Sequence, residues 1–435
     1  MIQKMKGTYD LIEDMPTLQW IERKILQVSK LFNYKEIRTP HFEASGLFHR
    51  SVGETTDIIS KETYDFLDRG KRETTLRPEG TAGVVRAYIE NKLYANPQTP
   101  HKYFYYGSMF RYERPQKGRF REFRQFGAEA FGSDSPLLDA ETIAYAVTFL
   151  KSLKLKDLKV SLNGLGDRES KQAYHDALKA YLKEDINELC KDCQKRYHEN
   201  PLRILDCKVD VNHPALVNAP KPIVYLTDTD KQHFDDVISA LKKMEIDVEV
   251  DPSLVRGLDY YTHTVFEIKV SKELLGNQNA ICGGGRYNHL VETLDGPKTP
   301  AVGFSFGIER LVIALKAAGL TVDDYASHLY LITLGERAQK EGLSLIQKLR
   351  LGGIIANMDF NAKSIKAQFK QSEHHNARFV AVLGDDELDR GELEIKDQTT
   401  QETIKAPLKS LYVTLVDLLT APSACDTCEQ KGEES

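Results

Sequence analysis

The sequence predicts an α+β fold followed by a smaller α/β domain, and three observations support this. Apolar residues near the N-terminus recur at helical spacing. Residues 103–112 and 119–131 are rich in Tyr and Phe and are separated by a polar turn, which is typical of an antiparallel hairpin. Beyond residue 326, apolar segments alternate with helical stretches, as they do in α/β domains.

Composition sets the broad class of the protein. The 435 residues suffice for two or three domains, and 41% hydrophobic with 28% charged residues is ordinary for a soluble protein. A net charge of −5 argues only against non-specific nucleic-acid binding, because a local basic face can still bind RNA. The N-terminus lacks the apolar segment of a secretory signal, and no apolar run approaches the ~20 residues of a spanning helix. We therefore expect a cytoplasmic protein without membrane association.

The elements follow in order along the chain. The opening helix presents one apolar face, formed by Leu18, Ile21, Ile25, Val28 and Phe32. An extended segment with Ile37 and Thr39 precedes the hairpin, and a helix over 139–153 follows it. Strands are expected at 259–270 and 301–306, then a helix at 308–318. In the C-terminal domain, strands are expected at 329–334, 353–356 and 378–383, and helices at 337–350 and 362–374.

Changes in amino-acid composition and hydrophobic pattern along the chain indicate the domain boundaries. Residues 168–247 are Lys-rich and helical, and we interpret them as an insertion. Asp323 and Asp324 mark a linker. We predict a first domain over 1–325, a second over 326–420 and a disordered tail over 421–435.

The hairpin carries the strongest chemical signal. Because a strand alternates its faces, Gln125 and Glu129 point to one side. Arg111 lies within the aromatic first strand, and Arg114 and Arg119 flank the turn. Guanidinium groups suit phosphate because their fork donates two parallel hydrogen bonds. An edge hairpin with a solvated charged face is the alternative.

Two other stretches place polar groups beside glycine. Glu79 precedes Gly80 in a loop before a helix, where it could bind a ligand or simply favour the helix start. Arg256 precedes Gly257 and a Tyr pair, so it could reach a cleft or sit exposed beside a packed strand.

A glycine run and a helix start give the last two signals. Gly283–Gly285 would let a backbone approach a ligand closely, or form a surface loop. Arg310 lies in a first helical turn, where a positive charge is unfavourable unless an anion binds beside it.

The cysteines do not form a recognisable metal site. Cys190-x-x-Cys193, with His198 and Cys207 downstream, has ligand types that zinc accepts. The spacing does not match a closed site, and no second Cys-x-x-Cys lies nearby, so we expect no metal ligands. Six cysteines in all are too few for a disulfide scaffold, and the Cys425-x-x-Cys428 pair lies in the tail.

Taken together and in order, these signals resemble the histidyl-tRNA synthetase family. FYYGSMFRYERPQKGRFREFRQFGAEAFG and AVGFSFGIERL resemble the second and third motifs of class II aminoacyl-tRNA synthetases. LVRGLDYYT and GGGRY resemble histidine-specific stretches, and FNYKEIRTP resembles the motif that builds the class II dimer interface. The block KSIKAQFKQSEHHNARFVAVLGDDEL is similar to the anticodon-binding domain of that family. The resemblance runs from Met1 to about Leu419.

The resemblance implies a fold and an activity. The fold would be a six- or seven-stranded antiparallel sheet flanked by helices, with an inserted domain and a C-terminal α/β domain that binds the anticodon. The activity would be that of a histidine--tRNA ligase, which activates L-histidine with ATP, releases pyrophosphate and loads tRNA(His). The protein would be a homodimer, with Mg²⁺ bound to ATP and no organic cofactor.

The resemblance also assigns residues to roles. Positions that hold histidine match Glu79, Gly80, Thr81, Gln125, Glu129, Tyr260, Tyr261 and Tyr287. The catalytic arginines that face the α-phosphate of ATP match Arg111 and Arg256, and those near its γ-phosphate match Arg119 and Arg310. Arg114 and Gln116 lie where relatives meet the acceptor end of tRNA.

Two other classes of protein are possible on sequence grounds. Some relatives are regulatory subunits of ATP phosphoribosyltransferase, which typically lack the anticodon domain and the intact arginines. Arg111, Arg256 and Arg310 are all present here, as is a C-terminal domain. A histidine- or tRNA-sensing module would usually accompany further domains, for which 435 residues leave no room.

Overall fold

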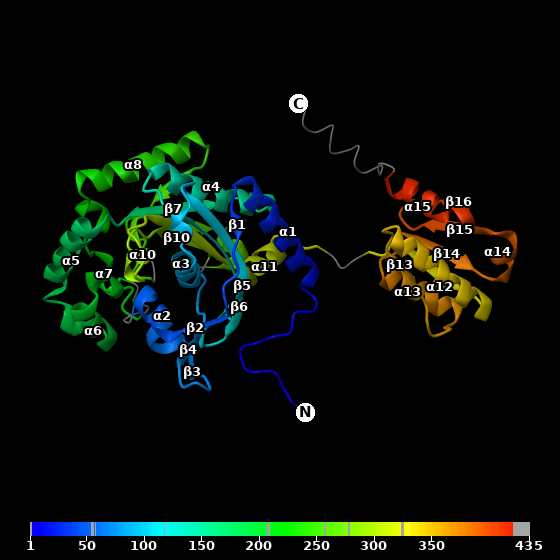
Figure 1. Cartoon of the computed structure of the whole chain (residues 1–435), viewed down its shortest axis with the longest axis horizontal. Coiled ribbons are helices and arrows are strands. Elements are labelled where there is room, and N and C mark those ends of the chain that lie inside the picture. Colours follow the sequence, from blue (N-terminus) through cyan, green and yellow to red (C-terminus); the bar gives the residue numbers. More distant parts are fainter. Residues whose placement is uncertain are drawn as a thin grey trace. The chain divides into compact units, whose positions relative to one another are not determined.

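The computed structural model divides after Thr321 into two compact units (Figure 1). It describes residues 2–53, 56, 58–116, 118–205, 207, 209–255, 258–276, 279–322 and 326–420. The predicted linker residues Asp323 and Asp324 and the predicted tail 421–435 lie outside the described residues. Among the described residues, no helix is both long and apolar enough to cross a membrane.

The larger unit is built on a mixed sheet with the strand order β1-β5-β6-β11-β10-β9-β7-β8. Its strands are β1 (Lys35–Glu36), β5 (His101–Phe110), β6 (Glu122–Phe131), β7 (Lys159–Gly164), β8 (Val248–Val250), β9 (Thr262–Lys269), β10 (Ala280–Arg286) and β11 (Ala301–Gly307). The strands from β5 to β7 in this order run antiparallel, whereas the short edge strands β1 and β8 run parallel to their neighbours. In the described chain the sheet therefore has eight strands, not the expected six or seven, because of these short edges.

The predicted hairpin is confirmed, and its side chains contribute to both faces of the sheet. Strands β5 and β6 pair antiparallel, with Tyr103 opposite Glu129 and Tyr105 opposite Gly127. Phe126 and Ala128 point into the main hydrophobic core. Their neighbours on β6 point to the other face, as period-two alternation requires.

Helices cover the core face of the sheet. They are α1 (Met15–Leu31), α4 (Pro136–Ser152), α8 (Asp228–Lys243) and α11 (Ile308–Ala317). The predicted apolar face of α1 is confirmed, since Leu18, Ile21, Ile25 and Val28 are all buried in this core. Helix α4 begins at Pro136, whose lost N–H is not needed there, and the Ser135 hydroxyl caps the first turn by accepting from Leu137 N at 3.3 Å.

The opposite face is only partly covered, by helices and a small antiparallel sheet. The helices are α2 (Ser45–Val52), α3 (Thr81–Glu90) and α10 (Leu290–Thr293), and α9 (Lys272–Leu275) lies between β9 and β10. The small sheet has the order β2-β4-β3, from β2 (Phe42–Ala44), β3 (Tyr64–Leu67) and β4 (Glu73–Leu76). A second apolar cluster beneath α3 and α10 includes Val84, Tyr88, Tyr105 and Leu290. The uncovered part of this face is the floor of the site described below.

The inserted region has a small core of its own. Its helices are α5 (Arg168–Leu182), α6 (Lys191–Glu199) and α7 (Pro214–Val217), which gather at one end of the unit (Figure 1). Buried residues from Tyr174 to Ala219 form this core. Helix α8, which the sequence analysis placed in the insertion, packs instead on the main core through Phe234 and Leu241.

The second unit is an α/β domain with a five-stranded sheet of order β13-β12-β14-β15-β16. Its strands are β12 (Leu329–Thr333), β13 (Ala356–Met358), β14 (Phe379–Leu383), β15 (Glu392–Asp397) and β16 (Thr403–Pro407). Its helices are α12 (Glu336–Leu351), α13 (Ile365–His374), α14 (Asp385–Arg390) and α15 (Leu411–Thr420). The three predicted strands correspond to β12, β13 and β14, which pair in parallel, whereas the antiparallel strands β15 and β16 were not anticipated.

A buried ion pair ties α4 to the end of β10. The side chains of Asp139 and Arg286 are both fully buried, and Arg286 Nε donates to Asp139 Oδ1 at 2.8 Å. Arg286 also donates to the carbonyls of Ser133 and Ser135, at 2.8 and 3.2 Å. Burial by itself would raise the pKa of the Asp139 carboxyl, yet the Arg286 guanidinium holds that pKa below its ordinary value.

We expect Asp139→Asn to destabilise the larger unit by about 3–5 kcal/mol, because it leaves the Arg286 charge buried without a counter-charge. Urea unfolding measures the change. The matched control is Asp295→Asn, which breaks an exposed Arg50–Asp295 pair with 50% and 77% side-chain exposure. The control should lose no more than about 1 kcal/mol. Equal losses in the two variants would contradict a special role for the buried pair.

Candidate active site

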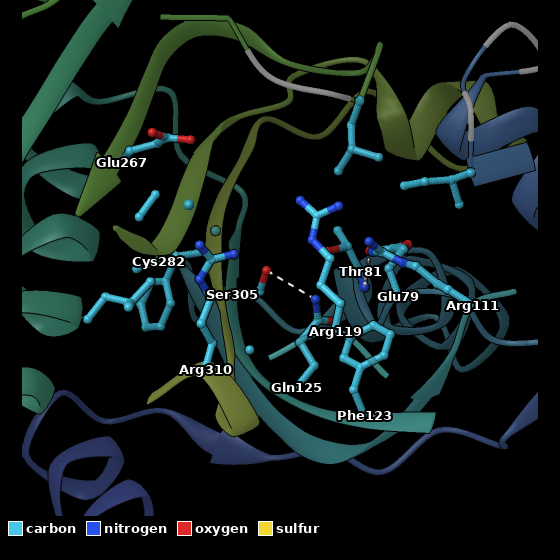
Figure 2. A pocket seen from close by; sticks show the side chains of 18 of the residues that line it. Glu79, Thr81, Arg111, Arg119, Phe123, Gln125, Glu267, Cys282, Ser305 and Arg310 are labelled. Atoms are coloured by element: carbon cyan, nitrogen blue, oxygen red, sulfur yellow. Dashed lines mark hydrogen bonds between the residues drawn. The ribbon is translucent and has the colours of Figure 1, made fainter. Parts of the chain in front are cut away.

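A pocket of about 690 Å³ lies on the uncovered face of the central sheet. Its lining comes from β6, β9, β10 and β11, from the start of α3, and from Arg203 of the insertion. Figure 2 shows Gln125 and Ser305 on the floor, with Glu79, Thr81 and Arg111 on one side and Glu267 on the other. The pocket brings together residues far apart in the sequence, including most of those that the sequence analysis singled out.

The carboxylate of Glu129 is one of the buried polar groups that line the pocket. Its side chain is 1% exposed and accepts hydrogen bonds from the Thr81 hydroxyl at 2.8 Å and from the Tyr287 hydroxyl. Burial raises the pKa of Glu129 to about 8, although these two donors work against the rise. The group can therefore change its charge near neutral pH, when a ligand arrives.

Glu79 both stabilises the start of α3 and lines the pocket. Its carboxylate accepts from the backbone N–H groups of Thr81 and Ala82, at 2.8 and 2.7 Å, so it stabilises the start of α3. It also lines the pocket, and burial raises the pKa of its carboxyl. The helix start thus holds a second acceptor at a defined position.

Gln125 links the loop before α3 to the sheet. Its Oε1 accepts from the Gly80 N–H at 3.0 Å, and its Nε2 donates to the Ser305 hydroxyl at 3.2 Å (Figure 2). The amide is held at both ends, so its orientation toward the pocket is determined before any ligand binds.

Three tyrosines form the wall next to these acceptors. The rings of Tyr260 and Tyr287 lie 5.5 Å apart between centroids, and those of Tyr260 and Tyr261 lie 4.8 Å apart. Burial raises the pKa of Tyr260 and of Tyr287 well above the ordinary value, so both hydroxyls stay neutral. Neutral hydroxyls can donate to or accept from a planar polar ligand.

Glycine is required where side chains of the site approach the backbone. A Cβ on Gly303 would lie 1.8 Å from Glu129 Oε2, and a Cβ on Gly80 would lie 2.1 Å from the Tyr105 ring. The predicted glycine run is also part of the sheet, because Gly283–Gly285 lie inside strand β10 and do not form a surface loop. A Cβ on Gly284 would lie 2.3 Å from the Gly303 carbonyl oxygen.

Arginines surround the other part of the pocket. Arg111 donates from Nε to the Pro78 carbonyl at 2.8 Å, and its guanidinium lies 5.2 Å from the centre of the Phe123 ring. Arg119 and Arg310 also line the pocket. Burial lowers the pKa of Arg310, and the neighbouring positive charge of Arg119 lowers it further. Two like charges held close together form a site suited to an anion.

The remaining predicted residues are not among the lining residues that the structure describes. Arg256 lies outside the described residues, but its neighbours Val255 and Leu258 both line the pocket. Arg114 and Gln116 are exposed in the connection between β5 and β6 and do not line the pocket, although Glu113 and Arg119 of the same connection do. Backbone hydrogen bonds between Gln116 and Arg119 close this connection.

Sequence reasoning missed several lining residues, three of which carry charge and hold hydrogen bonds or face the arginines. Glu267 on β9 lines the pocket near Arg310, and its position between the apolar residues Phe266 and Ile268 was a usable signal. Glu309 accepts from the Arg124 backbone N–H at 2.9 Å and from the Tyr9 hydroxyl at 2.8 Å. Arg203 arrives from the insertion and donates from Nε to Asp259 at 2.9 Å, a contact that no local pattern predicts.

Comparison with known proteins gives consistent matches for both units. Residues 10–311 match the histidyl-tRNA synthetase family, and residues 328–418 match the family of anticodon binding domains. A histidine--tRNA ligase of Geobacillus sp. (strain WCH70) is 49% identical over 408 residues, or 93% of this chain and 96% of the relative. A histidine--tRNA ligase of Oceanobacillus iheyensis is 45% identical over 95% of this chain and 97% of its own.

Solved structures show the same similarity. The apo histidyl-tRNA synthetase of S. aureus superposes with a TM-score of 0.81 at 39% identity, covering 95% of this chain and all of that one. A Bacillus halodurans C protein described as an ATP phosphoribosyltransferase regulatory subunit/histidyl-tRNA synthetase gives a TM-score of 0.63 at 22% identity, with 85% and 96% coverage. At that identity the second similarity shows the fold alone.

We expect the buried Glu129 carboxyl to make the unliganded protein less stable as the pH rises. Its pKa is higher in the folded chain than the ordinary 4.5, so the folded state binds more protons between pH 4.5 and about 8. The contribution is fully present below pH 4.5 and is lost as the pH rises through 8. Glu129→Gln should therefore melt about 2 °C or more above the wild type at pH 8, with a smaller gain at pH 5.

Thermal unfolding at several pH values measures this difference. Glu184→Gln, at an exposed position of the insertion, is the control and should leave the pH slope unchanged. A gain for Glu129→Gln that is the same at pH 5 and pH 8 would contradict the raised pKa.

Proposed function

The chain belongs to the histidyl-tRNA synthetase family, and we propose that its pocket binds L-histidine and ATP next to each other. As a histidine--tRNA ligase, the protein activates histidine with ATP, releases pyrophosphate and transfers histidine to the 3′ end of tRNA(His). One observation supports this site assignment above the others. A single pocket contains buried acceptors around Glu129 at one part and arginines at another.

The acceptors suit the amino acid. Histidine carries an α-ammonium and an imidazole N–H, both of which donate hydrogen bonds. Carboxylates at Glu79 and Glu129 and the Gln125 amide supply acceptors for them, and Thr81 and Gly80 hold these groups in place. An ammonium beside Glu129 would favour its ionised form, since an opposite charge stabilises a carboxylate. The tyrosines Tyr260, Tyr261 and Tyr287 then flank the imidazole.

The arginines suit the nucleotide. We assign Arg111 and Arg256 to the α-phosphate, and Arg119 and Arg310 to the γ-phosphate. Burial at Arg310 strengthens its attraction for a phosphate, because the surrounding dielectric is lower than in water. ATP arrives with Mg²⁺, for which the Glu267 carboxylate offers the oxygen ligand that this ion prefers.

The chemistry then needs positioning more than proton transfer. A carboxylate oxygen of histidine attacks the α-phosphorus in line, the bond to the bridging oxygen breaks, and pyrophosphate leaves. Arg111 and Arg256 stabilise charge at the pentavalent centre. In the second step a hydroxyl of the terminal ribose attacks the carbonyl carbon, loses its proton, and AMP departs. We assign Arg114 and Gln116, in the exposed hairpin connection, to the acceptor end of tRNA.

A regulatory subunit of ATP phosphoribosyltransferase is the second candidate, because such a protein has the same fold. The match of residues 328–418 to an anticodon binding domain and the arginines that line the pocket favour the ligase. We place the protein in the cytoplasm, where translation uses charged tRNA.

We expect the protein to exchange labelled pyrophosphate into ATP only when L-histidine is present, because the adenylate forms reversibly before any tRNA binds. The other amino acids, tested one at a time, are the controls. Equal exchange with another amino acid would contradict the assignment of the acceptors to histidine. No exchange with any amino acid would favour the regulatory subunit.

Arg310→Ala should raise the KM for ATP by about 10- to 100-fold, since a hydrogen bond to a charged group contributes roughly 1.5–3 kcal/mol. Histidine should still raise the melting temperature of the variant, because Arg310 lies apart from the acceptors. Arg310→Lys should recover only part of the affinity, as a point charge cannot reproduce the guanidinium fork. Arg50→Ala removes an exposed arginine and is the control. An unchanged KM in Arg310→Ala would remove this residue from the ATP site.

We also propose a homodimer, formed around the segment that resembles the class II interface motif. A groove of about 700 Å³ runs along residues 36–41 in the larger unit. Phe42, next to this groove, is 62% exposed, an unusual position for an aromatic side chain. An isologous interface would bury this patch against its own copy.

Light scattering should therefore give the mass of two chains, and Phe42→Asp should shift it toward one. Phe360→Asp is the matched control, because Phe360 is 61% exposed but lies in the second unit. A monomeric wild type at micromolar concentration would contradict the dimer.

A further inference from the structure

We propose that the insertion holds a structural zinc ion between Cys190, Cys193, Cys207 and Asp210. Each of these residues offers one ligand atom, and the four atoms all lie within 4.8 Å of one another. Spacing alone led us to expect no metal here, but the fold brings together a complete set of four ligands. The proposal concerns a region outside the pocket and does not depend on the residue roles assigned above.

The distances between ligand atoms fit a tetrahedral zinc ion. Zinc binds thiolate sulfur at about 2.3 Å and carboxylate oxygen at about 2.0 Å, which gives tetrahedral edges of roughly 3.8 Å between two sulfurs and 3.5 Å between sulfur and oxygen. The Sγ atoms of Cys190 and Cys207 lie 3.7 Å apart. Cys207 Sγ lies 3.5 Å from Asp210 Oδ2. Both distances match without rearrangement of the backbone.

The local structure holds these ligands in two turns. Cys190 is the N-cap residue of α6 and Cys193 lies in its first turn, so the helix start presents both sulfurs to one side. The second turn carries Cys207 and Asp210, and the Asp210 N–H donates to Cys207 Sγ at 3.4 Å. The Cys190 N–H donates to Asp210 Oδ2 at 3.0 Å and joins the two turns. Backbone N–H groups of this kind support thiolate ligands of a metal.

The chemistry of the ligand set favours zinc over other occupants. Three soft thiolates exclude Ca²⁺ and Mg²⁺, which take oxygen ligands. An iron–sulfur cluster would spread its thiolates over several iron atoms and so hold them farther apart. A disulfide needs sulfurs about 2.0 Å apart and would use only two of the three cysteines. All three are free thiols.

The fourth ligand explains why the sequence pattern was not recognised. A zinc site of this class usually has two Cys-x-x-Cys pairs. Here the second pair is Cys207-x-x-Asp210, with a carboxylate in place of the last thiolate. His198, the other zinc-type side chain of this stretch, is exposed on α6 and does not belong to the cluster.

The ion would stabilise a small core and, through it, one wall of the active site. Cys193 and Cys207 are buried in the core of the insertion, which is small for a module that must fold without a cross-link. Residues 194–206 connect the two ligand pairs. This segment carries Asn200 and Arg203, which bond to Asp259 at 3.0 and 2.9 Å, next to Tyr260. Zinc would therefore act as a positioning element for the pocket.

Metal analysis of the full chain tests the proposal. The background variant carries Cys425→Ser and Cys428→Ser, which removes the two other paired thiols. Protein that is expressed with zinc and dialysed against metal-free buffer should contain about one zinc ion per chain, as measured by elemental mass spectrometry. Cys190→Ser and Cys207→Ser should lose that zinc, whereas His198→Ala should keep it. Asp210→Cys should also keep it, because it restores the usual set of four thiolates.

Two further measurements separate a metal site from a merely buried thiol cluster. Cobalt substitution should give the intense visible bands of a tetrahedral thiolate complex, and Cys190→Ser should abolish them. A strong chelator should lower the melting temperature of the wild type and expose the segment 194–206 to protease, and added zinc should reverse both effects.

The proposal is overturned by any of three results. These are zinc-free protein with all the thiols titratable, iron at one per chain in place of zinc, or a mass two hydrogens lower that reports a disulfide. Each is measured without the pyrophosphate exchange assay, so the failure of the zinc site is distinguishable from a failure of the proposed activity.

Discussion

One face of the central sheet packs against the hydrophobic core, and the other face must leave space for the pocket. Strand β6 lies at the centre of this requirement, because Phe126 and Ala128 fill the core while Gln125 and Glu129 point into the pocket. Glycine makes this space possible. Gly303 lies directly opposite Glu129 in the neighbouring strand, and a Cβ there would collide with the carboxylate. The pocket is thus a region of the sheet where glycines leave room for a few polar side chains.

This arrangement determines the electrostatics of the site. A carboxylate on such a face is buried by its surroundings, so burial raises the pKa of Glu129 and makes its charge responsive to a ligand. Burial also strengthens the field of Arg310 at the other part of the pocket. The protein keeps these unfavourable groups in place through contacts elsewhere. The clearest is the buried Asp139–Arg286 pair, since Arg286 immediately precedes Tyr287, whose hydroxyl bonds to Glu129.

The peripheral parts of the chain contribute to the pocket indirectly. The insertion supplies Arg203, which joins the Asp259 turn to α6 and the cysteine cluster. A zinc ion in that cluster would hold the segment that carries Arg203. The position of the pocket wall at Asp259 would then depend on the metal site and not only on the small apolar core of the insertion. The second unit has its own hydrophobic core, which includes Leu331, Phe379 and Leu415. A separate core allows this unit to carry a separate function. Its match to anticodon binding domains agrees with a division of labour between amino-acid activation and tRNA recognition.

The sequence by itself determined those features that follow from local periodicity. The faces of β6 follow from the two-residue repeat of a strand, and the buried face of α1 from helical spacing. The motif resemblance likewise selected many of the polar pocket residues, because short segments carry them intact. Tertiary structure decided whatever depends on pairing between distant segments. Gly283–Gly285 became a strand only through β9 and β11, Asp210 became a candidate ligand only beside Cys190, and α8 joined the main core only by packing on α4. Such contacts depend on which surfaces meet after the chain has folded, and a local pattern holds no record of a partner many residues away.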